Sequence, residues 1–267
     1  MGDVFSRQPL VRTGLFMART TRPVELRALV RALRVTPIEQ RLIRVGSCRD
    51  GGYLLPDDLH GVQHCFSPGV AACSDFECDL ANRGMRVCMA DRSVDGPAAA
   101  HPRFQFIKKF LASTDDPDEG LITLDTWYRE AVGPVAAQAP EAVLQMDIEG
   151  AEYEVLHNVS DVLLQRFRIV VIEFHRLHQL ADRYAFRWMS GAFRKLLRHH
   201  AVVHIHPNNN RRILLCGGLR IPATMEFTFL RRDRIQAANH PPMLPNPLDC
   251  RNVASKPDLV LPACWYA

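Results

Sequence analysis

The sequence contains no apolar run that approaches the roughly 18 residues needed for a membrane-spanning helix. The N-terminus lacks an apolar stretch followed by a small-residue cleavage site, so we expect no signal peptide. The eight cysteines form no Cys-x-x-Cys pair and no zinc-ligand spacing, and several stand in apolar segments, where a thiol behaves as a small hydrophobe. These absences predict a reduced, cytoplasmic protein without a membrane span.

Aromatic side chains and net charge are both modest. The 267 residues include three Trp and five Tyr, and the formal charge is +4. The basic excess lies in helix-like segments at 19–34 and 194–198, which is typical of a solvated face. An aromatic, basic groove for nucleic acid is therefore not expected.

The Gly-x-Gly-x-x-Gly fingerprint of dinucleotide-binding enzymes is also absent. What the sequence does contain is a regular alternation of apolar strand-like and helix-like segments. Strands are expected at 62–67, 86–90, 104–108, 142–147, 168–174, 201–206 and 224–230, and helices at 74–83, 152–156 and 185–199. This alternation predicts an α/β fold with a mostly parallel sheet.

Both ends of the chain differ from this middle part. Residues 1–40 are expected to form a loose arm and one or two helices, because Leu26, Leu29, Val30 and Leu33 recur at helical spacing. Residues 41–236 form the expected main domain. Residues 237–267 are rich in proline and are expected to be an irregular tail packed on that domain.

Polar residues follow the first two expected strands, where an open α/β sheet binds ligands. The first strand ends in Ser67-Pro-Gly69-Val, where the glycine lets the backbone approach a ligand and a helix N-terminus follows. The second ends in Asp91, whose carboxylate can accept hydrogen bonds from both hydroxyls of a ribose. Separately these residues are an ordinary turn and a helix cap, but together they favour an adenosyl site.

A cluster of carboxylates follows the fourth expected strand. Asp147 and Glu149 are two residues apart, so they point to the same side of an extended backbone, and Glu152 follows. Three such carboxylates repel one another unless a cation, a donor or a proton is present. A helix N-terminus, which favours negative charge, explains Glu152 but not Asp147 at the end of a buried strand.

Two later strands end in histidines. Glu173 and His175 share one side of the fifth strand, and His204 and His206 share one side of the sixth. A single histidine is more often structural than catalytic. Two clusters that end adjacent strands beside Asp147 favour a functional site.

These segments resemble the FkbM-type methyltransferase family. The resemblance is strongest in Asp147-Ile-Glu-Gly-Ala-Glu-Tyr-Glu-Val-Leu, and it spans roughly residues 41–231. It continues in Arg44-Val-Gly-Ser, Asp50-Gly-Gly-Tyr53, Thr123-Leu-Asp125, Glu173-Phe-His175, His206-Pro-Asn-Asn209 and Met225-Glu-Phe-Thr-Phe. It implies a class I methyltransferase fold, a Rossmann-like, seven-stranded and mostly parallel sheet, that moves the methyl group of S-adenosylmethionine to a hydroxyl. The acceptors it implies are sugars, polysaccharide precursors or secondary metabolites.

The expected site follows from these residues and this resemblance. The residues expected to bind the cofactor are Gly69, Ser74, Asp91, Arg92, Asp125 and Asp147, with Ser74 or Asp75 holding the methionine moiety. A Mg²⁺ or Mn²⁺ ion held by Asp147, Glu173 and His206 would lower the pKa of the acceptor hydroxyl.

The base and the overall reaction are left with alternatives. His175 or Glu149 would be the base beside such a metal, and His175 or His206 would be the base without one. A methyltransferase acting on nucleic acid or protein, and a nicotinamide-dependent enzyme, are the alternative functions. The sequence leaves a homo-oligomer open.

Overall fold

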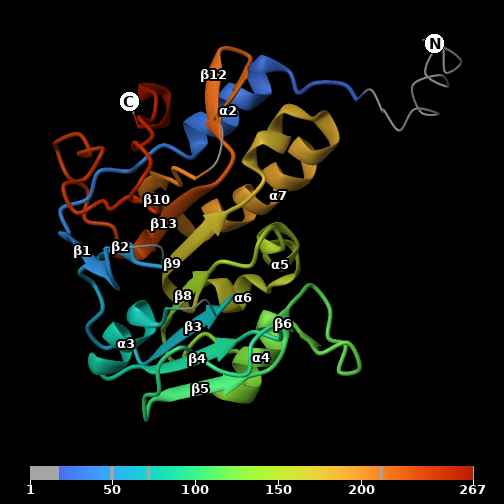
Figure 1. Ribbon diagram of the computed structural model, residues 1–267, viewed down its shortest axis with the longest axis vertical. Coiled ribbons are helices and arrows are strands. Elements are labelled where there is room, and N and C mark those ends of the chain that lie inside the picture. The colour runs from blue at the N-terminus through green and yellow to red at the C-terminus, as the bar shows by residue number, and fades with distance from the viewer. Residues whose placement is uncertain (1–17, 49–50, 71–72, 211–212, 267) are drawn as a thin grey trace, which may run out of the picture.

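The computed structural model describes residues 18–48, 51–70, 73–210 and 213–266. Its centre is a twisted sheet with helices on both faces (Figure 1). The seven strands are β3 (His64–Pro68), β4 (Arg86–Ala90), β5 (Phe104–Ile107), β8 (Ala142–Met146), β9 (Phe167–Phe174), β10 (His200–Pro207) and β13 (Met225–Arg231). They lie in the order β10-β13-β9-β8-β3-β4-β5.

The strand directions confirm the expected mostly parallel α/β sheet. Neighbouring strands from β5 to β9 pair in parallel, whereas β13 pairs antiparallel with both β9 and β10. The chain builds outward from β3 through β4 to β5, and then returns to add β8 on the other side of β3. The strand order therefore reverses between β3 and β8, which is the place where open α/β sheets bind their ligands.

Alternating side chains of the strands supply two separate cores. Phe66, Leu144 and Val170 belong to one core, whereas Cys65 and Val143 point into the other. The first core is covered by α2 (Pro23–Ala32), α4 (Leu124–Ala131), α5 (Glu152–Asn158), α6 (Asp161–Leu164) and α7 (Arg183–His199). The second is covered by α3 (Asp75–Asn82) and the hairpin of β1 (Leu42–Val45) and β2 (Tyr53–Pro56). Because both faces are covered, the central strands consist almost entirely of apolar residues.

Side-chain caps explain where two of these helices begin. Asp182 accepts hydrogen bonds from the backbone N–H groups of Tyr184 and Ala185, each at 2.9 Å, and so starts α7. The Thr123 hydroxyl accepts a hydrogen bond from the backbone N–H of Thr126 at 3.2 Å, and so starts α4. The sequence contains both signals, although only α7 was expected.

The ends of the chain differ in how much of them the structure describes. The expected N-terminal arm lies mostly outside the described residues, and α2 follows it. Between 238 and 266 the described chain forms one short 3₁₀ helix, η4 (Ala263–Trp265), which agrees with the expected irregular tail. No helix in the described part of the chain is long and apolar enough to cross a membrane. The domain boundaries at 41 and 236 stay a prediction.

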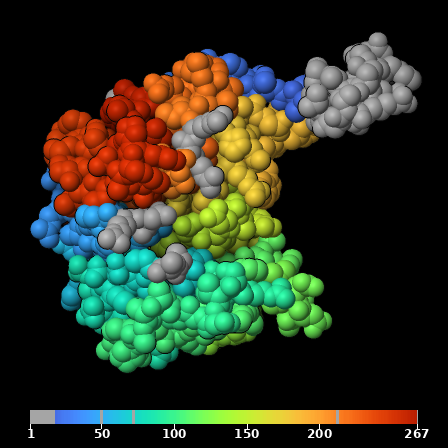
Figure 2. All heavy atoms as spheres, viewed as in Figure 1, coloured from blue at the N-terminus to red at the C-terminus, as the bar shows by residue number. Residues whose placement is uncertain are grey.

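The tail is held to the sheet by buried contacts. The Trp265 ring is fully buried near Phe227, with ring centroids 6.3 Å apart. His204 Nε2 lies 2.9 Å from Asp249 Oδ1, and both side chains are almost completely buried. Figure 2 shows the tail, in red, as a continuous surface beside the orange hairpin of β11 (Ile213–Cys216) and β12 (Leu219–Pro222). The tail thus packs against β10 and β13, at the edge of the sheet that β10 forms.

Candidate functional site

A cleft of about 560 Å³ opens at the carboxyl ends of β3, β4 and β8. This volume is in the range of small-molecule sites, roughly 300–1,000 Å³. Gly69, Asp91, Asp147 and Glu149, four of the residues expected in the site, line it. The rest of its wall comes from Ala90, Ser93, Phe110, Leu111, Ala112, Ser113, Thr114, Leu121, Ile148, Ala151 and Glu154. The cleft lies where the strand order reverses, as the position of ligands in such sheets predicts.

Gly69 shapes this cleft through a close backbone contact. Its φ is +87°, and an added Cβ would lie 1.7 Å from the carbonyl oxygen of Asp147. Its N–H donates to the carbonyl oxygen of Ala90 at 3.0 Å. The loop after β3 therefore presses against the ends of both β4 and β8, and only glycine has the conformation and the space for this.

Asp91 joins the loops that follow β3 and β4. Its Oδ2 accepts a hydrogen bond from Val70 N at 3.0 Å. Its Oδ1 accepts from Ser93 N at 2.7 Å and from the Ser93 hydroxyl at 2.6 Å. A carboxylate has about four acceptor positions, so Asp91 keeps acceptor capacity toward the cleft that it lines.

Arg92 and Asp125, which were expected to bind the cofactor, do not line the cleft. Arg92 donates a hydrogen bond to the backbone oxygen of Glu119. Asp125 accepts hydrogen bonds from the backbone N–H of Ser160, at 2.8 Å, and from the Ser160 hydroxyl. Asp125 thereby connects α4 to the start of α6, which is a structural role.

Ser74 precedes α3 but makes no side-chain cap there. Its buried hydroxyl oxygen accepts a hydrogen bond from Ala98 N at 3.2 Å. Residues 71–72, just before it, lie outside the described residues. A contact of Ser74 or Asp75 with the methionine moiety stays a prediction.

The chain after β8 folds around one buried carboxylate. Glu149 and Gly150 both have positive φ, at 55° and 113°. Glu152 Oε1 accepts hydrogen bonds from Gly150 N at 3.0 Å and from Ile148 N at 3.3 Å. Left-handed backbone at a non-glycine residue is costly, of order 1–3 kcal/mol, and persists only where surrounding contacts impose it. The Glu152 carboxylate, which is fully buried, supplies those contacts.

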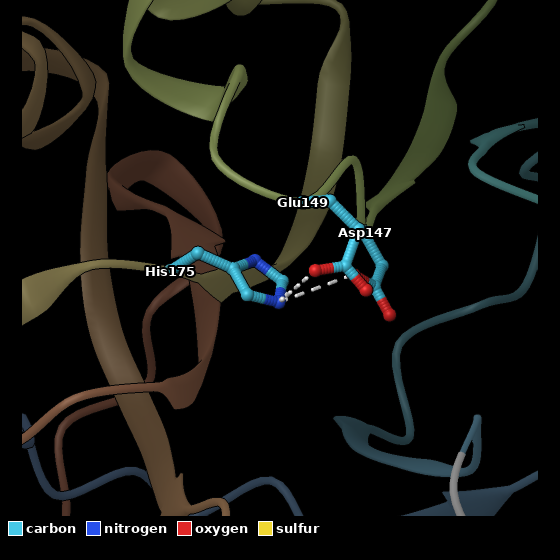
Figure 3. A group of neighbouring side chains, drawn as sticks. All are labelled: Asp147, Glu149 and His175. Carbon is cyan, nitrogen blue, oxygen red and sulfur yellow. Dashed lines mark ion pairs between the residues drawn. The ribbon is translucent and has the colours of Figure 1, made fainter. Parts of the chain in front are cut away.

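His175 brings the end of β9 to this turn. Its Nδ1 lies 3.0 Å from Glu152 Oε1, and its Nε2 lies 3.5 Å from Glu149 Oε2 and 3.8 Å from Asp147 Oδ1. Figure 3 shows the ring directed across the gap toward the two carboxylates. The Tyr153 hydroxyl donates to the backbone oxygen of His175 at 2.7 Å and fixes its backbone.

Burial and neighbouring charges change the pKa of two groups in this cluster. Burial raises the pKa of Asp147 to about 6, aided by the charges of Glu149 and Glu152 and opposed by His175 and by a hydrogen bond with Glu173. Burial lowers the pKa of His175, but the hydrogen bond to Glu152 and the surrounding carboxylates outweigh it, so the pKa is raised. Both shifts favour the protonated forms, so protons or a cation would reduce the repulsion among these carboxylates.

The predicted metal ligands Asp147, Glu173 and His206 do not form one group. Among the described residues, the three acid and imidazole side chains whose ligand atoms lie within 4.8 Å of one another are Asp147, Glu149 and His175. The histidine clusters were expected on adjacent strands, but β13 lies between β9 and β10. His206 is thus three strand spacings from β8, roughly 14 Å at about 4.8 Å per strand.

His206 and Glu173 have other neighbours. His206 Nδ1 lies 3.7 Å from Glu226 Oε2, and its Nε2 lies 3.7 Å from Asp258 Oδ1 in the tail. Glu173 Oε1 accepts a hydrogen bond from Asn208 Nδ2 at 2.7 Å. Glu226 of β13 lies directly opposite Glu173 in the ladder and separates it from His206.

Residues 112–215 match the profile of the family described as the methyltransferase FkbM domain. This segment of the chain is thus similar to FkbM-type methyltransferases, in agreement with the resemblance noted in the sequence. The matched segment contains Asp147, Glu149, His175 and His206, whereas Gly69 and Asp91 precede it.

Solved structures are similar to this chain at low sequence identity and low TM-score. Fibrillarin in its complex with Nop5p is 9% identical, with 65% of this chain and 74% of that chain covered and a TM-score of 0.34. The N-methyltransferase NodS from Bradyrhizobium japonicum is 13% identical, with 64% and 86% covered and a TM-score of 0.33. Neither bears on substrate or mechanism. No curated protein matches the sequence.

Three residues that contact the predicted site residues were missed by the sequence-based prediction of the site. Glu152 was explained by the helix N-terminus, Tyr153 was not considered, and Glu226 was noted only as part of a strand. Glu152 and Tyr153 stand within the most specific family segment, immediately after Gly150 and Ala151. Their position there is the signal that could have identified them.

Proposed function

We propose that this FkbM-type domain transfers the methyl group of S-adenosylmethionine to a hydroxyl oxygen of a small molecule or glycan, such as a sugar, a polysaccharide precursor or a secondary metabolite. The observation that carries the proposal is the setting of His175. One ring nitrogen is held by a buried carboxylate, and the other lies beside Asp147 and Glu149. These two carboxylates line the cleft, whereas His175 lies behind them. A positioned imidazole of this kind can accept the proton of an attacking hydroxyl.

The residues of the cleft fit the cofactor. Asp91 offers acceptor positions to ribose hydroxyls. Phe110, 43% exposed, and Leu111 offer apolar surface to an adenine ring. The carboxylates of Asp147 and Glu149 favour a positively charged sulfonium. When bound, S-adenosylmethionine supplies the electrophilic methyl group.

His175 acts in this scheme as the general base. Its Nε2 accepts the hydroxyl proton while the acceptor oxygen forms its bond to the methyl carbon and the sulfur–methyl bond breaks, which leaves S-adenosylhomocysteine. Glu152 stabilises the resulting imidazolium through Nδ1, and the nearby carboxylates of Asp147 and Glu149 stabilise its charge. The proton then leaves to solvent, and the raised pKa of His175 predicts that turnover increases with pH on the acidic side.

A first test concerns the cofactor. We expect S-adenosylmethionine or S-adenosylhomocysteine to raise the melting temperature and NAD not to, because the sequence lacks the glycine fingerprint that binds a pyrophosphate. Asp91→Ala should weaken binding, measured by calorimetry, by about 1.5–3 kcal/mol. Asp95→Ala is a control, since this side chain is 96% exposed and pairs with Lys108 outside the cleft. Equal stabilisation by NAD would contradict the assignment.

A second test concerns a divalent cation. Asp147, Glu149 and His175 have the donor types and mutual distances to hold one, and the ion would lower the pKa of the acceptor hydroxyl. The raised pKa values of Asp147 and His175 allow protons to balance the charge instead. We therefore expect turnover to continue in excess chelator. Loss of turnover that Mg²⁺ or Mn²⁺ restores would assign His175 to the metal and move the base elsewhere.

A further inference from the structure

Glu152 is a fully buried carboxylate that does not line the cleft but contacts the residue proposed to act there. We infer that Glu152 is a positioning residue, which holds the proton of His175 on Nδ1 and so presents an unprotonated Nε2 to Asp147 and Glu149, which line the cleft. The inference rests on the proposed function for its purpose, although its geometry stands independently of it.

The hydrogen bond between Glu152 and His175 has a defined direction. Glu152 Oε1 is surrounded by donors, namely the backbone N–H groups of residues 148 and 150 in addition to the ring of His175. Because two backbone N–H groups already donate to Oε1, this oxygen acts as an acceptor, and Nδ1 of His175 donates to it. In the neutral ring the other nitrogen, Nε2, then carries the lone pair. Either role of Nε2, as a base or as a metal ligand, needs this tautomer.

The same turn of α5 also holds the backbone of His175. Tyr153, the next residue of α5, donates its hydroxyl proton to the backbone oxygen of His175. The Tyr153 ring is buried against Phe174, with centroids 5.4 Å apart. Two consecutive residues of α5 therefore fix the ring and the backbone of His175, so its direction toward Asp147 and Glu149 is imposed by residues that do not line the cleft.

The alternative is that Glu152 only stabilises the turn through the backbone N–H groups of residues 148 and 150. The variant Glu152→Gln separates the two roles, since an amide oxygen can still accept from those backbone groups. The amide also carries donors, so it no longer forces His175 to keep its proton on Nδ1. The side-chain amide can either accept a hydrogen bond from Nδ1 or donate one to it, so the neutral ring of His175 can adopt both tautomers.

The experiment is a ¹⁵N spectrum of the imidazole of His175 in the full chain, recorded at a pH where the ring is neutral and without added ligand. We expect the wild-type protein to carry the proton on Nδ1 and Glu152→Gln to shift a substantial fraction to Nε2. Tyr153→Phe is the control, because it removes the backbone contact and leaves the ring contact. Glu152→Asp keeps a carboxylate, so a larger fraction of its His175 rings should carry the proton on Nδ1 than in the glutamine variant. If Glu152→Gln folds poorly, the tautomer of Glu152→Asp can still be compared with that of the wild-type protein.

The outcomes distinguish this inference from the proposed function. A wild-type ring protonated on Nε2, or a tautomer that Glu152→Gln leaves unchanged, would overturn the inference whatever the enzyme does. If the tautomer shifts, methyl transfer in Glu152→Gln should fall about 10–100-fold, as for other partners that orient a histidine. A shifted tautomer together with a fully active His175→Gln enzyme would keep Glu152 as the positioning residue but contradict His175 as the base.

Discussion

Replacing His175 with glutamine is expected to lower the rate of methyl transfer by about 10²–10⁴-fold, the usual contribution of a positioned general base. Glutamine preserves most of the side-chain volume but cannot accept the hydroxyl proton. The affinity for S-adenosylmethionine should change little, because the proposed adenosyl contacts come from the loops after β3 and β4. Single-turnover rates and calorimetric affinities on the same folded variant measure the two effects separately.

His200 supplies a matched control for this experiment. It is also a buried histidine, but its Nε2 lies 2.7 Å from the backbone oxygen of Phe167, and burial lowers its pKa to about 4. It is therefore neutral and structural, so His200→Gln should lower the melting temperature and leave the rate of the folded protein unchanged. If His175→Gln behaves like His200→Gln, then His175 is structural and the base must be sought at Glu149.

Alanine at Gly69 is expected to destabilise the fold and weaken cofactor binding together. The substitution places a Cβ in left-handed backbone, which costs about 1–3 kcal/mol. It also forces the carbonyl oxygen of Asp147, 1.7 Å from that Cβ, to move. Displacing well-packed atoms typically costs a further 1–3 kcal/mol or so. Because the displaced residue lines the cleft, we expect the affinity for S-adenosylhomocysteine to fall at least about tenfold.

The variant Gly61→Ala separates the cost of left-handed backbone from the cost of displacing packed atoms. The φ of Gly61, +79°, is close to that of Gly69, but an added Cβ would meet no atom within 4 Å. Gly61→Ala should therefore show only the backbone cost in urea-induced unfolding and should bind the cofactor normally. Equal unfolding free energies for the two variants would mean that the loop after β3 does not press against Asp147.

The strands of the sheet could be predicted because their sequences are short apolar runs. The strand expected at 86–90 coincides with β4, and the run at 168–174 begins one residue after the start of β9. The β11–β12 hairpin was not predicted, since no residue of β11 is fully buried and its apolar residues do not mark a buried face. Helix α4 could have been found, because Leu124, Trp127 and Tyr128 stand at helical spacing after the Thr123 cap.

The site was harder to predict where it depends on strand order. Asp147 and Glu149 could be identified because they follow a buried strand directly. The position of His206 could not, since the sequence does not show that β13 inserts between β9 and β10. Asp125 and Arg92 are similar cases, because their partners Ser160 and Glu119 were not identifiable before the chain was folded.

The most direct test of the account is the crystal structure of the protein with S-adenosylhomocysteine. We expect the ligand in the cleft at the end of β3, β4 and β8, with its ribose hydroxyls on Asp91 and its sulfur on the side of Asp147 and His175. A ligand bound elsewhere, or bound in this cleft with its sulfur directed away from His175, would contradict it.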